Sequence, residues 1–136
     1  MTQFKPLVGL IGVGTDIIEI ERLKRASERS GERLLEKIFT PGERSFCDAR
    51  SDRFSCYAAR FAAKEAVLKA MGTGMAGCGL ADVEVTRTRS GRPEIILHGA
   101  AAKIAKNKGI SAVLISMSHN RDQAVAFAVA EGKEVL

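Results

Sequence analysis

A carboxylate in the middle of a helix-patterned segment is the first side chain of this sequence that could carry chemistry. The segment runs from Arg53 to Met71 and stops at Gly72. With about 100° of rotation per residue, one narrow stripe holds the side chains expected on a core-facing helix: Phe54, Ala58, Phe61, Glu65 and Leu68. A carboxylate on an apolar face requires a charged partner, hydrogen bonds or a metal ion. The pattern therefore predicts a partner for Glu65.

Basic residues surround Glu65 on the same predicted helix. Lys69 lies one turn further on at the edge of the stripe, while Arg60 and Lys64 share an adjoining face. The helix presents an acid bordered by bases, and two interpretations stay open. Glu65 and Lys69 form a structural ion pair between neighbouring turns, or Glu65 belongs to a site that binds a charged ligand.

Two more polar residues lie beside apolar segments that predict strands. Asp16 is expected to end a buried strand within Leu7–Ile20 or to begin the turn after it, and taken alone it is typical of a helix N-cap. His119 follows the predicted strand 112–118, where a lone histidine is typical of a turn. The glycines before Asp16 lack the rest of a nucleotide-binding fingerprint, so they predict close backbone packing.

Three arginines share one face of a helix predicted over residues 20–29. Arg22, Arg25 and Arg29 are spaced three and four residues apart. Glutamates interleave with them, which is typical of a solvated charged face. The alternative is a docking surface for an acidic helix of a partner protein.

The other segments predict one α+β domain over residues 1–136, with residues 1–6 as a loose leader. Thr40, Pro41 and Glu43 form a capping box that starts a short helix. The glycine-rich segment 72–79 is a linker or a loop that approaches a ligand closely. The remaining predicted elements are strands at 82–88 and 93–98, a helix at 100–108, and strands at 112–118 and 123–130.

Composition places this chain among water-soluble globular proteins. Hydrophobic residues make up 46% and charged residues 27% of the 136 residues, and no run approaches the ~18 apolar residues of a membrane helix. The apolar stretch near the N-terminus is broken by glycines and is no signal peptide. Cys47, Cys56 and Cys78 match no zinc-binding pattern, so we expect reduced thiols and a cytoplasmic location.

The net charge of +5 suits a polyanionic partner. Nucleic acid, a phosphorylated cofactor and an acidic protein all fit this charge. One tyrosine and no tryptophan leave few stacking platforms, which argues against a protein that binds single-stranded nucleic acid.

Taken together, separated motifs resemble the holo-[acyl-carrier-protein] synthases, a family of 4′-phosphopantetheinyl transferases. The resemblance covers residues 11–130 and keeps the order and nearly the spacing of the family. It rests on four segments: Gly14–Ile17 with Arg22, Phe39–Glu43, Arg60–Ala66 with Lys69, Gly72 and Gly74, and Ser116–His119. Asn120, where the family more often has threonine, and the longer leader are departures from it.

The resemblance implies transfer of the phosphopantetheine arm of coenzyme A to a serine of an apo acyl carrier protein, for fatty acid biosynthesis. Asp16 and Glu65 would bind Mg²⁺, which takes one or two carboxylates and completes its shell with water and phosphate oxygens. Lys69 or Lys64 would neutralise the leaving group. The proton acceptor is left open between Glu65 and a water molecule.

The resemblance also implies the binding residues and the assembly. Coenzyme A would contact the following residues: Arg60, Lys64, Gly72, Gly74 and His119. Arg22, Arg25 and Arg29 would face the carrier protein. The short members of the family are trimers with active sites between subunits, so His119 and Asp16 would meet across an interface. The resemblance implies no nucleic-acid partner and no membrane partner. The rival interpretation is a small basic α+β module that binds RNA or an acidic protein, with a buried Glu65–Lys69 pair and no metal.

Overall fold

The structure, a computed structural model, describes residues 9–74 and 77–132. Its elements in chain order are β1 (Leu10–Glu19), α1 (Ile20–Ser30), α2 (Glu32–Ile38), α3 (Pro41–Asp48), α4 (Arg53–Ala70), the 3-10 turn η1 (Leu80–Asp82), β2 (Val83–Arg87), β3 (Pro93–Leu97), α5 (Gly99–Asn107), β4 (Ile110–His119) and β5 (Gln123–Gly132). The predicted leader at residues 1–6, and positions 75–76 of the glycine-rich segment, lie outside the described residues.

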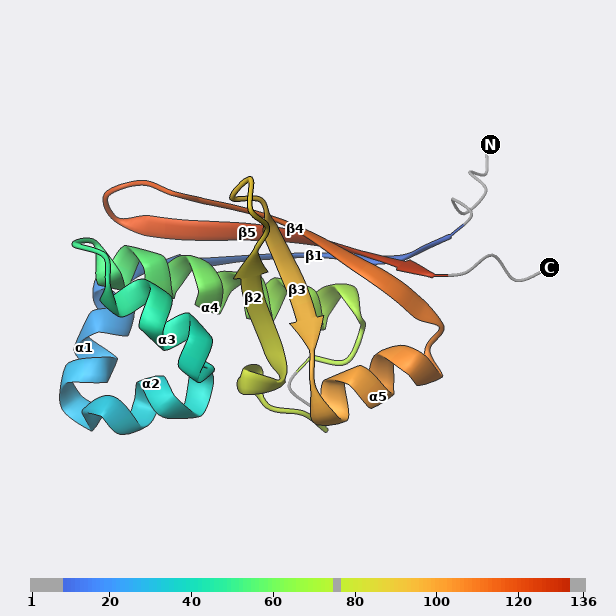
Figure 1. The fold of residues 1–136 in the computed structure, drawn as a ribbon, viewed down its shortest axis with the longest axis horizontal. Coiled ribbons are helices and arrows are strands. Elements are labelled where there is room, and N and C mark those ends of the chain that lie inside the picture. Colours follow the sequence, from blue (N-terminus) through green and yellow to red (C-terminus); the bar gives the residue numbers. More distant parts are fainter. Residues whose placement is uncertain (1–8, 75–76, 133–136) are drawn as a thin grey trace, which may run out of the picture.

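An antiparallel sheet and the helix α4 form the two layers of the fold, which confirms the predicted α+β class. The sheet has the order β1-β5-β4, and a separate hairpin pairs β2 with β3. Figure 1 shows the three-stranded sheet nearly edge-on, with the helices and the hairpin on one side of it. Within the described residues no helix is long and apolar enough to cross a membrane.

Small residues let α4 lie directly on the sheet. Every second residue of β5 is a buried alanine: Ala124, Ala126, Ala128 and Ala130. A Cβ atom on Gly12 would collide with the carbonyl oxygen of Ala70, and one on Gly14 with that of Ala66. The predicted close packing at these glycines is therefore confirmed, and the main chains of β1 and α4 are in contact.

The predicted buried stripe of α4 is wrong in part. Ala58 and Leu68 are fully buried, but Glu65 is only partly buried. The fully buried charged residue is Lys64, whose exposed fraction is 0%. The predicted stripe follows the large apolar residues, but α4 packs its alanines against the sheet. Other elements cover most of the remaining sides of α4.

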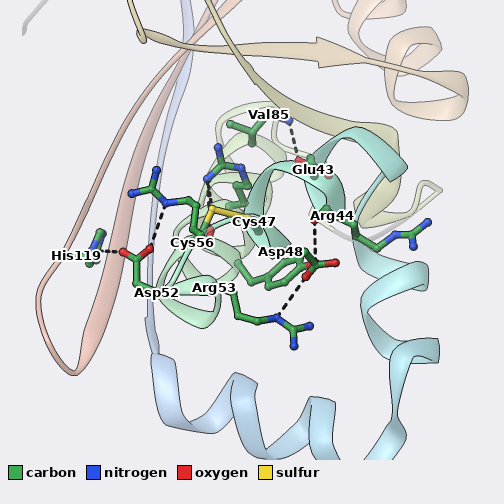
Figure 2. The surroundings of a disulfide bond; sticks show 12 residues. Glu43, Arg44, Cys47, Asp48, Asp52, Arg53, Cys56, Val85 and His119 are labelled. Atoms are coloured by element: carbon green, nitrogen blue, oxygen red, sulfur yellow. Dashed lines mark hydrogen bonds and ion pairs between the residues drawn. A yellow bond between two sulfur atoms is a disulfide. The ribbon is translucent and has the colours of Figure 1, made fainter.

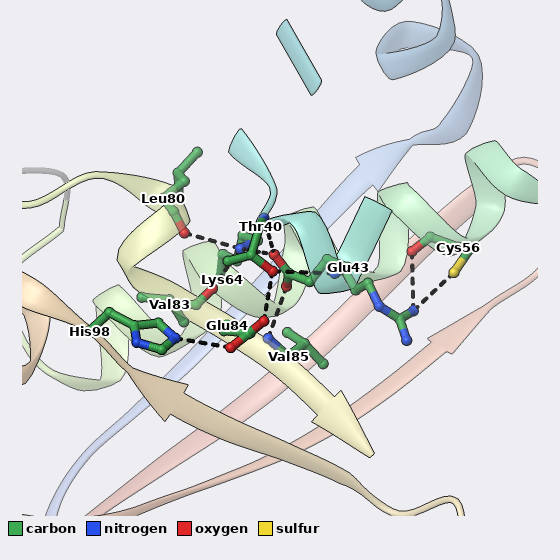
Figure 3. Close-up of polar contacts among 10 residues, drawn as sticks. Thr40, Glu43, Cys56, Lys64, Leu80, Val83, Glu84, Val85 and His98 are labelled. Carbon is green, nitrogen blue, oxygen red and sulfur yellow. Dashed lines mark hydrogen bonds and ion pairs between the residues drawn. The ribbon is translucent and has the colours of Figure 1, made fainter. Parts of the chain in front are cut away.

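Lys64 forms a buried ion pair that joins α4 to α3 (Figure 3). Its Nζ donates to Glu43 Oε1 at 2.6 Å and to the carbonyl oxygens of Leu80 and Val83. Glu43 also accepts from the backbone N–H groups of Thr40 and Val85, and its bond from Thr40 completes the predicted capping box. Burial lowers the pKa of Lys64, while the Glu43 carboxylate opposes that shift. Three hydrogen bonds therefore occupy the donors of Lys64.

Replacing Glu43 by glutamine is expected to lower the free energy of unfolding by about 3–5 kcal/mol, because it leaves a buried cation without its counter-charge. Urea unfolding followed by circular dichroism would measure this loss. Glu36 is exposed on α2, so Glu36→Gln is the matched control and should change stability by less than about 0.5 kcal/mol. Equal stabilities of the two variants would contradict the structural role of the pair.

The prediction of reduced thiols is wrong for two of the three cysteines. Cys47 of α3 and Cys56 of α4 form a disulfide with a Cα–Cα distance of 5.5 Å (Figure 2), and Cys78 is free. A short connection turns α4 back against the last turn of α3 and brings the two sulfur atoms together. No recognised motif has this spacing, so the bond could not be predicted from the sequence.

Asp16 lies inside β1 and not at its end, and the N-cap position of α1 belongs to Glu19. Because side chains alternate along a strand, Asp16 is on the same face as Gly12 and Gly14, toward α4. The opposite face of the sheet carries exposed apolar side chains, which are Val13, Ile17 and Phe127 with smaller contributions from Ile11 and Leu114. We call these five residues the open sheet face.

Candidate active site

Two carboxylates and a lysine line one cavity beside α4. Asp16 of β1, Glu65 and Lys69 surround a cavity of about 490 Å³ whose other walls come from α1 and α2. Burial raises the pKa of Glu65, the charge of Asp16 raises it further, and Lys69 opposes both. A cation bound beside both carboxylates would offset the effect of Asp16 on Glu65, so these residues form a site for a cation. We call these three residues the carboxylate half-site.

Lys69 is held by β1 and not by Glu65. Its Nζ donates to the carbonyl oxygen of Thr15 at 2.9 Å and to Asp16 Oδ1 at 3.3 Å. No ion pair joins Glu65 to Lys69 in the described part of the chain, so the structural ion pair considered from the sequence is wrong. The rival interpretation, a metal-free binding module, depended on a buried Glu65–Lys69 ion pair, and the structure does not contain this pair among the described residues.

The carboxylate half-site fits a magnesium ion. Carboxylate oxygens are the ligands that this hard cation prefers, and it commonly takes only one or two of them from the protein. Among residues 9–74 and 77–132 no cluster of three or more histidine, cysteine, aspartate or glutamate residues could hold a metal. Asp16 and Glu65 would therefore leave the other positions to water and to phosphate oxygens of a substrate.

A second cavity, of about 220 Å³, lies beside α4 and is basic. Three guanidinium groups lie over the ring of Phe46: Arg60 at 4.4 Å, Arg87 at 5.4 Å and Arg50 at 5.6 Å from its centroid. His119, at the end of β4, completes the lining. We call these four basic residues, with Phe46, the arginine pocket.

Arg60 is a buried cation that lacks an anion. Its exposed fraction is 2%, and its Nε has no hydrogen-bond partner. Burial is the largest cause that lowers the pKa of Arg60 to about 10, followed by the charge of Arg87. No ion pair neutralises Arg60 within the described residues. A buried charge without a partner is costly, so this pocket fits an anionic ligand such as a phosphate.

Asp52 lies between two members of the arginine pocket, His119 and Arg50. Its Oδ2 lies 3.9 Å from His119 Nε2, and its Oδ1 accepts from Arg50 Nε at 3.2 Å (Figure 2). Sequence reasoning missed the parts played by Phe46, Arg50 and Arg87. Phe46 is 37% exposed, and its ring supports the three arginines.

The carboxylate half-site and the arginine pocket lie along opposite flanks of α4, and we call them the two half-sites. The carboxylate half-site is beside β1 and the arginine pocket beside β4, and these strands are the two outer strands of the sheet. The structure thus brings Asp16, Glu65 and Lys69 together and Arg60 and His119 together, in separate cavities. A meeting of Asp16 with His119 therefore needs a second copy of the chain.

The predicted contact of Lys64 with coenzyme A is contradicted by the structure, because its side chain is enclosed and its donors are occupied. For the same reason Lys64 cannot neutralise a leaving group. Gly72 and Gly74 have φ angles of 74° and 54°, the left-handed region that favours glycine. They end α4 through hydrogen bonds from their N–H groups to carbonyl oxygens of its last turns.

The arginines of α1 form an exposed basic face next to the carboxylate half-site. Arg22, Arg25 and Arg29 line a shallow hollow together with three glutamates of β1 and α1. Arg25 is paired with Glu21 at 3.4 Å. Arg22 also lines the cavity of the carboxylate half-site. A partner bound to this face would therefore reach the carboxylates.

Comparisons with known proteins show which family this chain is similar to. Residues 12–128 match the family model of the 4′-phosphopantetheinyl transferase superfamily. The chain is 54% identical over 123 residues to the holo-[acyl-carrier-protein] synthase of Desulforudis audaxviator, covering 90% of this chain and 94% of that protein. It is also similar to two solved structures of such synthases.

The Neisseria meningitidis protein has a TM-score of 0.84 and 36% identity, covering 90% of this chain and 98% of that one. The Bacillus anthracis protein, in complex with CoA (3′,5′-ADP), has a TM-score of 0.76 and 32% identity. This match covers 92% of this chain and 99% of that one.

Proposed function

This chain belongs to the 4′-phosphopantetheinyl transferase superfamily, and we propose that it moves the phosphopantetheine arm of coenzyme A onto a serine of an apo acyl carrier protein. The products are holo acyl carrier protein, used in fatty acid biosynthesis, and adenosine 3′,5′-bisphosphate. One observation carries this conclusion for the chain itself. A carboxylate pair and a lysine share a cavity with Arg22, a member of the exposed basic face of α1.

The reaction requires positioning and charge neutralisation more than covalent catalysis. The serine oxygen attacks the phosphorus that carries the pantetheine arm, and the bond from this phosphorus to the bridging oxygen of the pyrophosphate breaks. Lys69 neutralises the negative charge that develops on the leaving phosphate. The serine proton passes to Glu65 or to a water molecule in the same cavity. Bound Mg²⁺, held by Asp16 and Glu65, would supply further neutralisation of the pyrophosphate.

The arginine pocket takes the third phosphate of coenzyme A in this proposal. The pyrophosphate occupies the carboxylate half-site, which leaves the phosphate on the ribose 3′ oxygen for Arg60 and His119. Gly72 and Gly74, at the end of α4, lie near the nucleotide. One coenzyme A molecule would have to cross α4 to reach both half-sites of a single chain. We therefore place it between the carboxylate half-site of one subunit and the arginine pocket of another.

A homotrimer built on the open sheet face would join the half-sites in this way. Val13, Ile17 and Phe127 are 67%, 60% and 58% exposed, and large apolar side chains gathered on one face favour a protein interface. We further propose that residues 1–136 form one cytoplasmic domain, with residues 1–6 as a leader. In this proposal the enzyme has no nucleic-acid or membrane partner.

Replacing Val13 by glutamate should dissociate the trimer, because the charge would be buried in an apolar interface. Light scattering after gel filtration would measure the mass, and transfer activity should fall with the trimer. Glu131→Gln changes an exposed residue at the end of β5 and is a control for the sheet. A monomer with full activity would contradict the shared active site.

Replacing Arg22 and Arg29 by alanine should raise the KM for the acyl carrier protein about tenfold or more, since rim charges that meet an acidic partner steer and orient it. The KM for coenzyme A should not change. Steady-state kinetics with each substrate varied in turn would separate the two constants. Lys24 lies on another face of α1, so Lys24→Ala is the matched control, and an equal rise of both constants would count against docking.

The proposed function is tested by mixing the protein with coenzyme A, Mg²⁺ and an apo acyl carrier protein and measuring the mass of the carrier. We expect the mass to increase by one phosphopantetheine group, and a chelator should abolish the increase. Transfer that persists in chelator would contradict the metal. No transfer to any of several carriers would overturn the proposed function.

A further inference from the structure

The disulfide between Cys47 and Cys56 forms part of the wall of the arginine pocket. Cys56 lines this cavity together with Arg60 and His119. Figure 2 shows the bond between α3 and α4, close to Asp52 and His119. The mechanism proposed above does not use these sulfur atoms. Their position nevertheless places a disulfide beside the proposed phosphate site.

Two contacts couple the bond to Arg60. Arg60 Nη1 donates to Cys56 Sγ at 3.1 Å and to the Cys56 carbonyl oxygen at 3.5 Å, its only hydrogen bonds within the described residues. On the other side of the bond, Cys47 follows Phe46 directly in α3. The ring of Phe46 supports the Arg60 guanidinium. The disulfide therefore fixes both the acceptor of Arg60 and the ring on which Arg60 lies.

We propose that the Cys47–Cys56 disulfide is a redox-sensitive positioning element of the arginine pocket, whose closure orients Arg60 toward the phosphate of coenzyme A and whose reduction weakens coenzyme A binding. This inference rests on the proposed function, because it assumes that the anion in the pocket is a phosphate of coenzyme A. It concerns regulation of that site and adds no catalytic step.

Reduction changes the pocket in two ways. A dithiol gives two electrons and two protons and becomes a disulfide, while the Cys47–Cys56 bond breaks and each sulfur gains one electron and one proton. The covalent cross-link between α3 and α4 next to Phe46 is then lost. In addition, the Cys56 sulfur is no longer held in place by Cys47, so the acceptor of Arg60 Nη1 is no longer fixed. Both changes weaken phosphate binding.

On the Cys56 side, the bond borders the cavity of the arginine pocket. Cys47 is fully buried, but Cys56 is 5% exposed and faces the cavity. A ligand in the pocket would cover this sulfur. Since coupling between two equilibria is reciprocal, coenzyme A must favour the disulfide by the same factor by which the disulfide favours coenzyme A.

The test compares oxidised with dithiothreitol-reduced protein. Alkylation and mass spectrometry should find one free thiol in the oxidised form, Cys78, and three in the reduced form. Titration calorimetry with Mg²⁺ present would measure the Kd of coenzyme A and of dephospho-coenzyme A, which lacks the 3′ phosphate. We expect reduction to raise the Kd of coenzyme A about fivefold or more. The Kd of dephospho-coenzyme A should change less than about twofold.

Variants assign the effect to this bond. Cys47→Ala keeps the Cys56 sulfur and should bind coenzyme A as weakly as the reduced protein, with or without dithiothreitol. Cys47→Ala/Cys56→Ala retains Cys78, so a response of this variant to the reductant would assign the effect elsewhere and overturn the inference. In a glutathione redox buffer, saturating coenzyme A should shift the wild type toward the disulfide by the factor found for Kd.

The possible failures are distinguishable. Equal Kd values for coenzyme A in both redox states, in a protein that transfers phosphopantetheine, would overturn the redox role and leave the proposed function standing. A parallel loss of dephospho-coenzyme A binding would show general unfolding and would also overturn the local role. Absence of both coenzyme A binding and transfer in either state would overturn the proposed function and this inference with it.

Discussion

Replacing Glu65 by glutamine is expected to lower the rate of phosphopantetheine transfer by at least about 100-fold, because it removes one of two carboxylates proposed to hold the metal and orient the pyrophosphate. Glutamine keeps the shape of the side chain and removes only its charge. Transfer measured at several Mg²⁺ concentrations should show a raised requirement for the ion. The Glu36→Gln variant, changed at an exposed position of α2, should retain full activity.

The same substitution should not weaken the fold. Burial and the charge of Asp16 raise the pKa of Glu65 above its value in the unfolded chain. The ionised carboxylate therefore destabilises the folded state as the pH rises above its ordinary pKa of about 4.3. Glutamine cannot ionise, so without metal the free energy of unfolding at neutral pH should be unchanged or higher. A loss of stability in proportion to the loss of activity would refute a catalytic role for Glu65.

Arg60→Met should raise the KM for coenzyme A about 30- to 100-fold, the effect of losing charge-assisted hydrogen bonds to a phosphate. Methionine retains much of the contact with Phe46. Dephospho-coenzyme A, without the 3′ phosphate, should be used about equally well by wild type and variant. Kinetics with both substrates would give the ratio of their KM values, which should fall toward one in the variant.

Arg33→Met is the matched control for Arg60, since Arg33 is exposed on α2 and contributes the same charge at a distance from the pocket. It should leave both KM values within about twofold of wild type. If Arg60→Met raised the two KM values equally, the pocket would be holding some other part of the molecule. The placement of the 3′ phosphate would then be wrong, although the transfer reaction would stand.

Local signals in the sequence predicted most of the elements. The capping box at Thr40 was correct because its hydrogen bonds lie within one turn of chain. The hairpin β2–β3 and the helix α5 begin and end within two residues of their predicted limits, since turns and glycines mark these places. The close packing at Gly12 and Gly14 also followed from residue type alone.

Contacts between distant residues were not predictable in this way. Lys69 bonds to Asp16, 53 residues away, and Lys64 to Glu43, 21 residues away. The helical pattern puts Lys64 and Glu65 next to each other on α4. It does not indicate which of the two side chains α3 buries. The arginine pocket likewise draws Phe46, Arg60 and Arg87 from three different elements, so no spacing in the sequence indicates it.

The contact between β1 and α4 limits how this enzyme can be stabilised by engineering. Exchanging a strand glycine for alanine commonly strengthens a protein, because it reduces the freedom of the unfolded chain. At Gly14 the new methyl group would meet the main chain of α4 at Ala66, the residue after Glu65. The helix would have to move away from β1, which carries Asp16. The separation of the two carboxylates is thus set by a position that must have no side chain, so a stabilising exchange at Gly14 would disturb the proposed metal site.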